Sequence, residues 1–219
     1  MISSYANKLI KEYAETMKAM QKVIANSEGR ERLACIWIKR KSHIAQATDG
    51  HVFAVLDIEA LDKELDAQDI DEAYNMLAFH AGYKALGYMN GYAFVTSKMH
   101  DQFVNAIGKP INDAAEWMSF DYPDLKKLLP ESGALKQSNQ NESIVDAKIL
   151  CILNNIRKTH EFAKHEKQIE IALWGENDRS VQIASYTGLL LGVVPILRDE
   201  TENESFNEAS YGEILNLLN

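Results

Sequence analysis

The order of the predicted elements repeats once along the chain, and this repeat constrains the fold more than any other feature. Each copy is a helix followed by three β-strands, and an inserted segment separates the two copies. A small sheet has to bury one face against another element, so each copy needs the other to complete a core. We therefore predict an α+β fold in which two helix-plus-three-strand halves pack about a pseudo-twofold axis, with both helices on one side of a sheet.

The first half begins with a long amphipathic helix. Apolar side chains recur at helical spacing over residues 4–27, Ser3 or Ser4 can cap the start, and Gly29 suits the end. Three segments with strand-like patterns follow, at 32–41, 43–48 and 51–59. The connections between them are very short, which predicts a meander of neighbouring strands.

The turn between the second and third of these strands reads Thr48-Asp49-Gly50-His51. Asp-Gly between two apolar segments is a strong hairpin signal, because a tight turn of this kind needs a positive φ, which glycine adopts without steric cost. The hairpin alone does not account for the threonine and the histidine. The turn is therefore either a self-contained hairpin or part of a surface that binds a partner.

The second half repeats the order of the first. A helix is predicted over 143–164, with Ser143 as its cap, and strand-like segments follow at 168–175, 179–186 and 188–198. The two halves therefore contain the same elements in the same order.

The segment between the halves has no counterpart elsewhere in the chain. Residues 62–90 are predicted to be helical, 91–98 to form a strand, and 101–118 to form one helix or two short ones, so the insertion is predicted to be mainly helical. The predicted organisation is a first half over 1–60, an insertion and connection over 61–130, a second half over 131–200 and an acidic, solvated C-terminal tail over 201–219.

The polar face of the first helix is basic, although the chain as a whole has a formal net charge of −9. Four lysines fall within one arc opposite the apolar stripe, and Glu15 partly offsets them. They are Lys8, Lys11, Lys18 and Lys22, and a weaker basic set on the second helix consists of Lys148, Arg157 and Lys158. A local basic stripe can contact phosphates even on an acidic protein. The alternative is the solvated face of an ordinary amphipathic helix.

Composition argues against a membrane protein. No apolar run approaches the roughly 20 residues that span a bilayer, and charged residues interrupt the N-terminal segment too often for a signal peptide. We therefore expect a cytoplasmic protein without a membrane partner. Cys35 and Cys151 lie far apart in apolar segments, so we expect buried thiols rather than a disulfide or a metal site.

Enzyme motifs are sparse. The sequence has no Gly-rich phosphate loop, no GxSxG elbow and no HExxH motif. His43, Asp49 and His51 suggest a small metal-dependent enzyme as an alternative, because Zn²⁺ accepts imidazole and carboxylate ligands. No further ligand is evident near them. We therefore expect no catalytic activity, no cofactor and no metal site.

Three short motifs, placed in this element order, resemble the bacterial DNA sliding clamp, the beta subunit of DNA polymerase III. The sequence ATDGH at 47–51 resembles the clamp's ATDGHR motif, FDYPDLKKLLP at 120–130 resembles its FPDYxxxxP connection, and VVPILR at 193–198 resembles its VMPMR ending. Val52 stands where the family has arginine, and an extra residue precedes Arg198. A bacterial clamp chain has three domains and is much longer, so the resemblance is to a shortened phage or prophage clamp-like protein.

The resemblance implies a DNA-clamp-like fold and a role in DNA replication. In the family, the ATDGHR turn and the VMPMR ending form a hydrophobic cleft. This cleft receives a short apolar peptide from DNA polymerase or another replication protein. Here the cleft would be lined by Thr48, Gly50, His51, Val52, Phe53, Val194, Pro195 and Ile196. Family helices line a ring and face duplex DNA, which would give the lysines a role as sequence-independent phosphate contacts and imply a homo-oligomer. The remaining alternative is a phage protein that binds replication partners without encircling DNA, or that competes with a host clamp.

Overall fold

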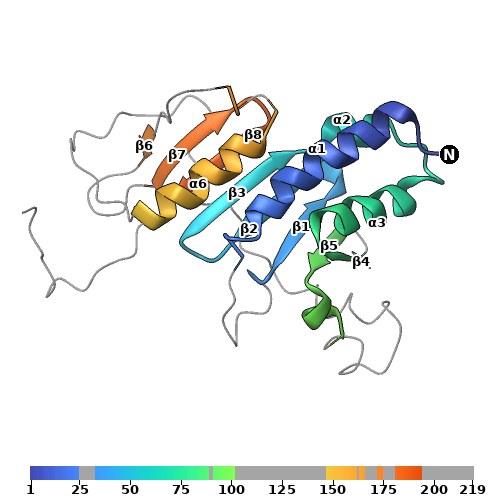
Figure 1. Cartoon of the computed structure of the whole chain (residues 1–219), viewed down its shortest axis with the longest axis horizontal. Helices are drawn as coiled ribbons and strands as arrows, with labels where there is room; N and C mark the ends of the chain where they lie inside the picture. Colours follow the sequence, from blue (N-terminus) through green and yellow to red (C-terminus); the bar gives the residue numbers. More distant parts are fainter. Residues whose placement is uncertain are drawn as a thin grey trace, which may run out of the picture.

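The computed structural model describes residues 1–24, 33–88, 91–101, 147–161, 163–165, 172–174 and 181–193. The helices are α1 (Ser4–Met20), α2 (Glu59–Lys63), α3 (Ile70–Ala81) and α6 (Ala147–Thr159), with a short 3₁₀ turn, η2 (Arg40–Ser42) (Figure 1). The strands are β1 (Cys35–Lys39), β2 (Ile44–Thr48), β3 (Val52–Asp57), β4 (Lys84–Tyr88), β5 (Gly91–Val95), β6 (Ala172–Trp174), β7 (Val181–Tyr186) and β8 (Leu189–Val193). The predicted connection 120–130, the ending 194–198 and the tail 201–219 lie outside the described residues.

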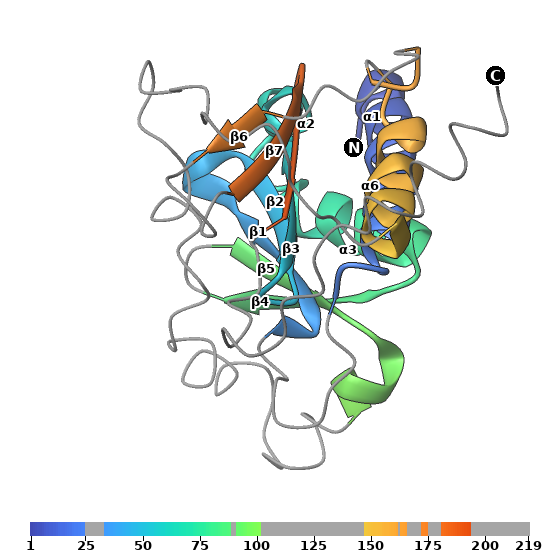
Figure 2. The ribbon, with the colours of Figure 1, turned by 90° about the vertical axis from the view of Figure 1, so that its left-hand side faces the viewer.

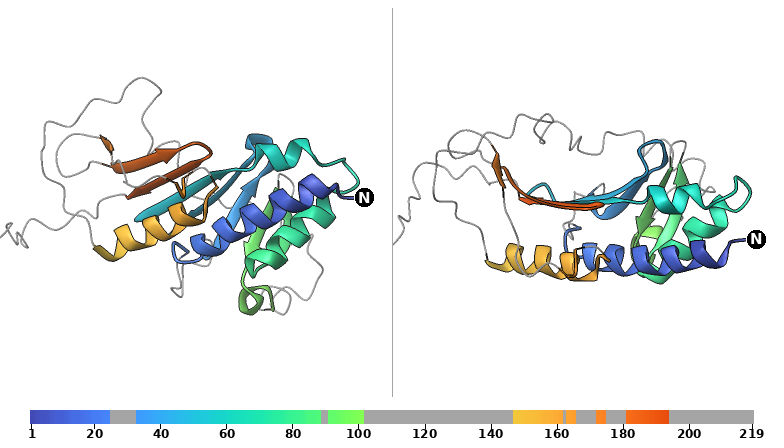
Figure 3. Two further views of the ribbon diagram at one scale, coloured as in Figure 1. Left: turned by 45° about the horizontal axis from the view of Figure 1, so that its top comes forward. Right: turned by 90° about the horizontal axis from the view of Figure 1, so that it is seen from above.

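Within the described residues, eight strands form one antiparallel sheet in the order β4-β5-β1-β2-β3-β8-β7-β6. The two halves meet where β3 pairs with β8, and the sequence β3-β2-β1 on one side of that pair is matched by β8-β7-β6 on the other. Both α1 and α6 lie on the same side of the sheet, next to each other (Figures 2 and 3). The predicted α+β class and the placement of both helices on one face are confirmed.

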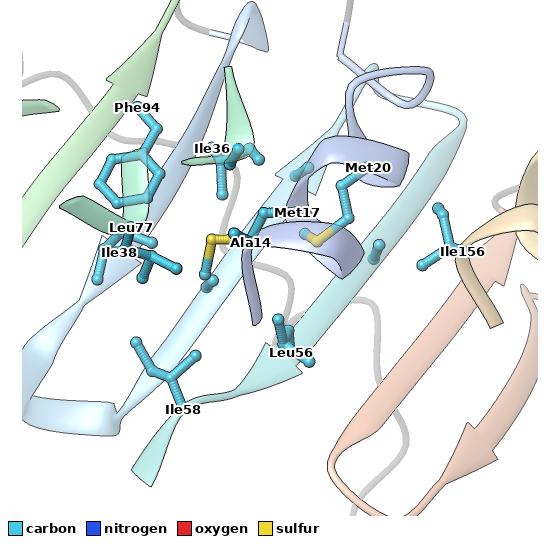
Figure 4. Close-up of a cluster of buried hydrophobic side chains, with 14 of the residues drawn as sticks. Ala14, Met17, Met20, Ile36, Ile38, Leu56, Ile58, Leu77, Phe94 and Ile156 are labelled. Atoms are coloured by element: carbon cyan, nitrogen blue, oxygen red, sulfur yellow. The ribbon is translucent and has the colours of Figure 1, made fainter. Parts of the chain in front are cut away.

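The core lies between this helix layer and the sheet. Met17 and Met20 of α1 lie above Ile36 and Leu56 of the strands, and Ile156 of α6 extends the cluster toward the second half (Figure 4). All five side chains are fully buried. Burying a side chain of this size contributes about 1.5–3 kcal/mol relative to leaving it in water. The helical spacing of the methionines and the alternation along the strands therefore produce one continuous core.

The first helix is shorter than its sequence pattern predicted. The Ser3 hydroxyl accepts a hydrogen bond from the Ala6 backbone N–H at 3.0 Å, which is the predicted N-terminal cap. The α-helical backbone ends at Met20, and the chain continues in turns as far as Ile24. The last part of the predicted helix, residues 25–27, lies outside the described residues.

The prediction that residues 62–90 are helical throughout was wrong. Gly82 adopts a φ of 84°, and the N–H of Tyr83 donates to the Ala78 carbonyl at 2.8 Å, so α3 ends there. The chain then forms β4, which pairs with β5, and β5 extends the sheet by pairing with β1. In the described residues the insertion therefore combines helices with a hairpin that joins the sheet, and it places α3 beside α1 (Figure 1).

The sheet is also buried on the face away from the helices. Cys35, Trp37, Leu86, Ala93 and Val95 form a second apolar cluster there, because alternate residues of a strand point to opposite faces. Burial raises the pKa of the Cys35 thiol, which keeps it protonated.

The prediction of two buried thiols holds for only one of them. Cys35 is buried, but Cys151 lies on an exposed position of α6. None of the helices in the described ranges is long and apolar enough to cross a membrane.

Candidate functional site

The turn between β2 and β3 is held by its own side chains. The Thr48 hydroxyl donates to the Val52 carbonyl at 2.7 Å and accepts from the Gly50 N–H at 3.0 Å. One carboxylate oxygen of Asp49 accepts from the N–H groups of His51 and Val52 at 2.8 and 2.7 Å. Gly50 has a φ of 95°, as the Asp-Gly signal predicted. Threonine and aspartate therefore serve the turn itself.

Two features of this turn are not used by its own hydrogen bonds: the space beside Gly50 and the side chain of His51. Apart from the two chain neighbours of Gly50, no heavy atom of a described residue lies within 4 Å of where a Gly50 side chain would begin. The half-exposed His51 ring makes no hydrogen bond or ion pair with any described residue. The histidine is thus the one member of the turn whose side chain the turn does not use.

The pairing of β3 with β8 brings together two motifs that lie far apart in the sequence. Val52, directly after the turn, is the register partner of Val193, the first residue of VVPILR. The three cleft residues that follow, Val194, Pro195 and Ile196, lie outside the described residues. The first half of the predicted cleft is therefore described, and Val193, the residue that precedes the second half, lies beside it.

Val52 and Phe53 point to opposite faces of the sheet. Val52 is buried in the cluster beneath the helices, whereas Phe53 lies on the other face, directly opposite Thr48 of β2 and Gly192 of β8. Phe53 is 0% exposed and Thr48 is 3% exposed. On the face away from the helices, the predicted cleft residues are thus Thr48 and Phe53, while Val52 belongs to the main core.

The four lysines of the predicted first helix are all exposed. Lys8, Lys11 and Lys18 lie on α1, and Lys22 lies in the turns that follow it. Lys8 forms an ion pair with Glu12 at 3.4 Å, and Glu15 is exposed on the same helix. Both acidic groups reduce the local positive potential. The lysine face of α1, defined by these four lysines, nevertheless remains a basic surface on an acidic chain.

The basic residues of α6 divide into two groups. Lys148 and Lys158 are exposed. Arg157 is buried, and its guanidinium donates to the Asn154 side-chain carbonyl at 3.1 and 2.9 Å and to the Ala163 carbonyl at 2.9 Å. Arg157 therefore holds the turn that follows α6 and lies off the exposed face on which the sequence had placed it.

Sequence reasoning missed a polar network at the corner between β1 and β2. His43 adopts a φ of 51°, and its Nδ1 lies 2.7 Å from Asp62 Oδ2. The other Asp62 oxygen accepts from the Tyr74 hydroxyl at 2.6 Å, and the Tyr74 ring stacks on Tyr92 with 4.6 Å between centroids. Burial and then the Asp62 charge raise the pKa of Tyr74, so the phenol remains a donor. No local spacing links His43 to Asp62, so the sequence had no signal for this contact.

This network engages one of the candidate metal ligands, His43, with a different carboxylate. His43 faces Asp62, whereas the Asp49 carboxylate is engaged in the turn. Across the described part of the chain, no group of three or more His, Cys, Asp and Glu side chains is placed to hold a metal ion.

The buried His160 predicts a pH-dependent contribution to stability. Its side chain follows α6 and packs against the β7–β8 turn, 3.5 Å from where a Gly188 side chain would begin. Burial lowers the pKa of His160 below its ordinary value of 6.5. The unfolded chain then binds a proton more readily than the folded protein, so stability falls as pH drops below about 6.5.

We expect His160→Gln to lose less stability than the parent between pH 7.5 and pH 5.5, as measured by urea unfolding at both values. The exposed His80 on α3 provides a matched control, and His80→Gln should show the same loss as the parent. An equal loss in His160→Gln and the parent would contradict the prediction.

No protein-family model, no curated protein and no solved structure matches this chain.

Proposed function

We propose that the protein is a sliding-clamp-like accessory protein of DNA replication. It binds a short apolar peptide of DNA polymerase or another replication protein beside the β2–β3 turn. It contacts duplex DNA without sequence specificity through the lysine face of α1, and it acts as a homo-oligomer.

The observation that carries the peptide-binding proposal is the pairing of β3 with β8. It sets Val52 beside Val193, so the ATDGH turn and the first residue of VVPILR lie at the same end of the β3–β8 pair. Gly50 and the His51 ring belong to the turn at that end. A glycine that allows close approach next to apolar side chains suits a peptide anchored by leucine or phenylalanine.

The placement of α1 and α6 supports the DNA-binding part of the proposal. The two helices form one layer on one side of the sheet (Figure 2). Five exposed lysines lie on them and a sixth, Lys22, follows the end of α1: Lys8, Lys11, Lys18, Lys22, Lys148 and Lys158. Between Ala147 and Thr159, α6 contains no acidic residue. Lysines on a helix layer suit loose contacts with phosphates, which position a duplex without reading its sequence.

A second candidate function is partner binding without DNA, by a phage protein that engages replication proteins or competes with a host clamp. Two observations favour it. Arg157 is buried and unavailable to phosphates, and Glu12 and Glu15 lie among the lysines of α1. This candidate keeps the peptide site and omits the DNA contact.

Calorimetric titration with a peptide that carries leucine and phenylalanine anchors tests the site common to both candidates. We expect His51→Ala combined with Ile196→Ser to weaken binding by about 1–3 kcal/mol, as for hot-spot contacts. His80→Ala, an exposed histidine elsewhere, should bind like the parent. Unfolding of the double variant should resemble that of the parent, because His51 is half-exposed and lies outside the core. Equal affinity of the parent and the double variant would mean that ATDGH is only a turn here.

A further inference from the structure

Three of the four side chains on the lysine face have no partner of opposite charge among the described residues. Lys8 pairs with Glu12. Lys11, Lys18 and Lys22 are exposed, and none of them forms an ion pair with a described side chain. Unpaired positive charges that share one face attract an anionic group.

The sequence contains an anionic segment of matching charge, residues 199–204, which we call the acidic segment. Its carboxylates are Asp199, Glu200, Glu202 and Glu204. Six acidic residues and no lysine or arginine occur between residues 199 and 219, so this part carries most of the formal net charge of −9. These residues lie outside the described ranges, and their sequence is sufficient to fix their charge.

The path of the chain starts the connection to the acidic segment at the same end of the sheet as the end of α1. β8 ends at Val193, which pairs with Val52 at the start of β3. α1 runs toward that end of the sheet (Figures 1 and 3), and Ile24, beyond the helix end, belongs to the same buried cluster as Val52. The acidic segment follows Val193 by six to eleven residues, which reach about 20–40 Å when extended.

This connection is long enough for the acidic segment to lie along the lysines. At the rise of a helix, the positions from Lys11 to Lys22 span about 16 Å. Carboxylates spaced over a short extended segment can therefore face several lysines at once.

We propose that the acidic segment docks on the lysine face and competes there with duplex DNA. The competition rests on the proposed DNA-binding function, whereas the docking does not. A lysine paired with a carboxylate of the segment is not available to a phosphate. Exposed ion pairs are individually weak, so the segment docks loosely, and a duplex with its dense row of phosphates displaces it.

Docking of this kind lowers the apparent affinity for DNA. A ligand that binds only the unoccupied form has its affinity reduced by the fraction of molecules in that form. Weakening the segment should therefore tighten DNA binding at low salt. The gain should shrink as salt rises, because salt screens the attraction between exposed charges.

Carbodiimide cross-linking of the full chain without DNA tests the docking, because this reagent joins a carboxylate directly to an amine that touches it. We expect cross-links between the acidic segment and the three unpaired lysines, located by mass spectrometry, and we expect a duplex to suppress them. Lys41, Lys63 and Lys84 are exposed elsewhere and should not be joined to the segment. A mixture of labelled and unlabelled chains shows whether each cross-link lies within one chain.

Fluorescence anisotropy with a labelled duplex tests the competition, using two full-length variants of equal net charge. The segment variant replaces three carboxylates of the acidic segment by amides: Glu200→Gln, Glu202→Gln and Glu204→Gln. The control variant does the same at three exposed positions that form no ion pair with a described residue: Glu64→Gln, Asp66→Asn and Glu72→Gln. We expect the segment variant to bind about tenfold tighter than the parent at low salt, and the control variant to stay within about twofold of it.

The outcomes separate the docking from the function on which the competition rests. Cross-links within one chain to the lysine face, together with tighter DNA binding by the segment variant alone, support the proposal. Absence of such cross-links, cross-links only between chains, or equal gains in the two variants overturns it. If no protein binds duplex DNA, the DNA-binding function and the competition both fail, and the cross-links still decide the docking.

Discussion

Replacing Lys11, Lys18 and Lys22 with glutamate is expected to abolish duplex DNA binding while the protein stays folded. All three lysines are exposed, and none forms an ion pair with a described residue. Each substitution exchanges an attraction to phosphate for a repulsion, so the affinity at low salt should fall about 100-fold or more. The measurement is fluorescence anisotropy with a labelled duplex at several salt concentrations, and binding by the parent should weaken steeply with salt.

A control of equal charge separates the lysine face from the net charge of the chain. Lys41, Lys63 and Lys84 are exposed and lie outside α1 and α6, so their replacement by glutamate should preserve most of the affinity. Equal losses in the two triple variants would show that only net charge matters. An unmodified protein that does not bind duplex at low salt would favour the partner-binding function without DNA.

Leu56→Ala is expected to lower the free energy of unfolding by about 2–5 kcal/mol. Leu56 is fully buried beneath the helices. It lies on β3 between Ala45 of β2 and Leu189 of β8, at the junction of the two halves. A cavity at this point removes contacts from both halves at once.

Urea unfolding of Leu56→Ala beside Val55→Ala provides the measurement and its control. Val55 occupies the adjacent position of the same strand, is half-buried and points to the other face, so its truncation should cost about 1 kcal/mol. Losses of the same size in both variants would indicate that the core beneath α1 is not continuous across the two halves.

The elements that the sequence predicted correctly are those with short-range signals. The Asp49-Gly50 pair predicted the β2–β3 turn, because the backbone requirement lies within the turn itself. Helical spacing of apolar residues predicted α1 and α6, and strand patterns predicted the strands of both halves. The sequence did contain a signal for the end of α3, because Gly82 is a helix-capping glycine. The prediction of a helix up to residue 90 overlooked this glycine and therefore missed β4.

The candidate site was only partly predictable. Its residues next to the turn follow from the motif, and the opposite orientations of Val52 and Phe53 follow from the alternation of a strand. The burial of Arg157 could not be predicted, because it depends on hydrogen bonds to a side chain and to a carbonyl beyond the helix end. The contact of His43 with Asp62 likewise joins two elements without a fixed spacing.

The sequence by itself determined the helices, the hairpins and which residues alternate along each strand, because these depend on interactions between residues close in the chain. Only the tertiary structure decided that β3 pairs with β8, that β5 extends the sheet beyond β1, and that the Phe53 ring lies across Gly192. The physical reason is that strand partners and cross-strand contacts are selected by burial of the whole sheet. Local patterns state that a strand has an apolar face but not which strand will lie next to it.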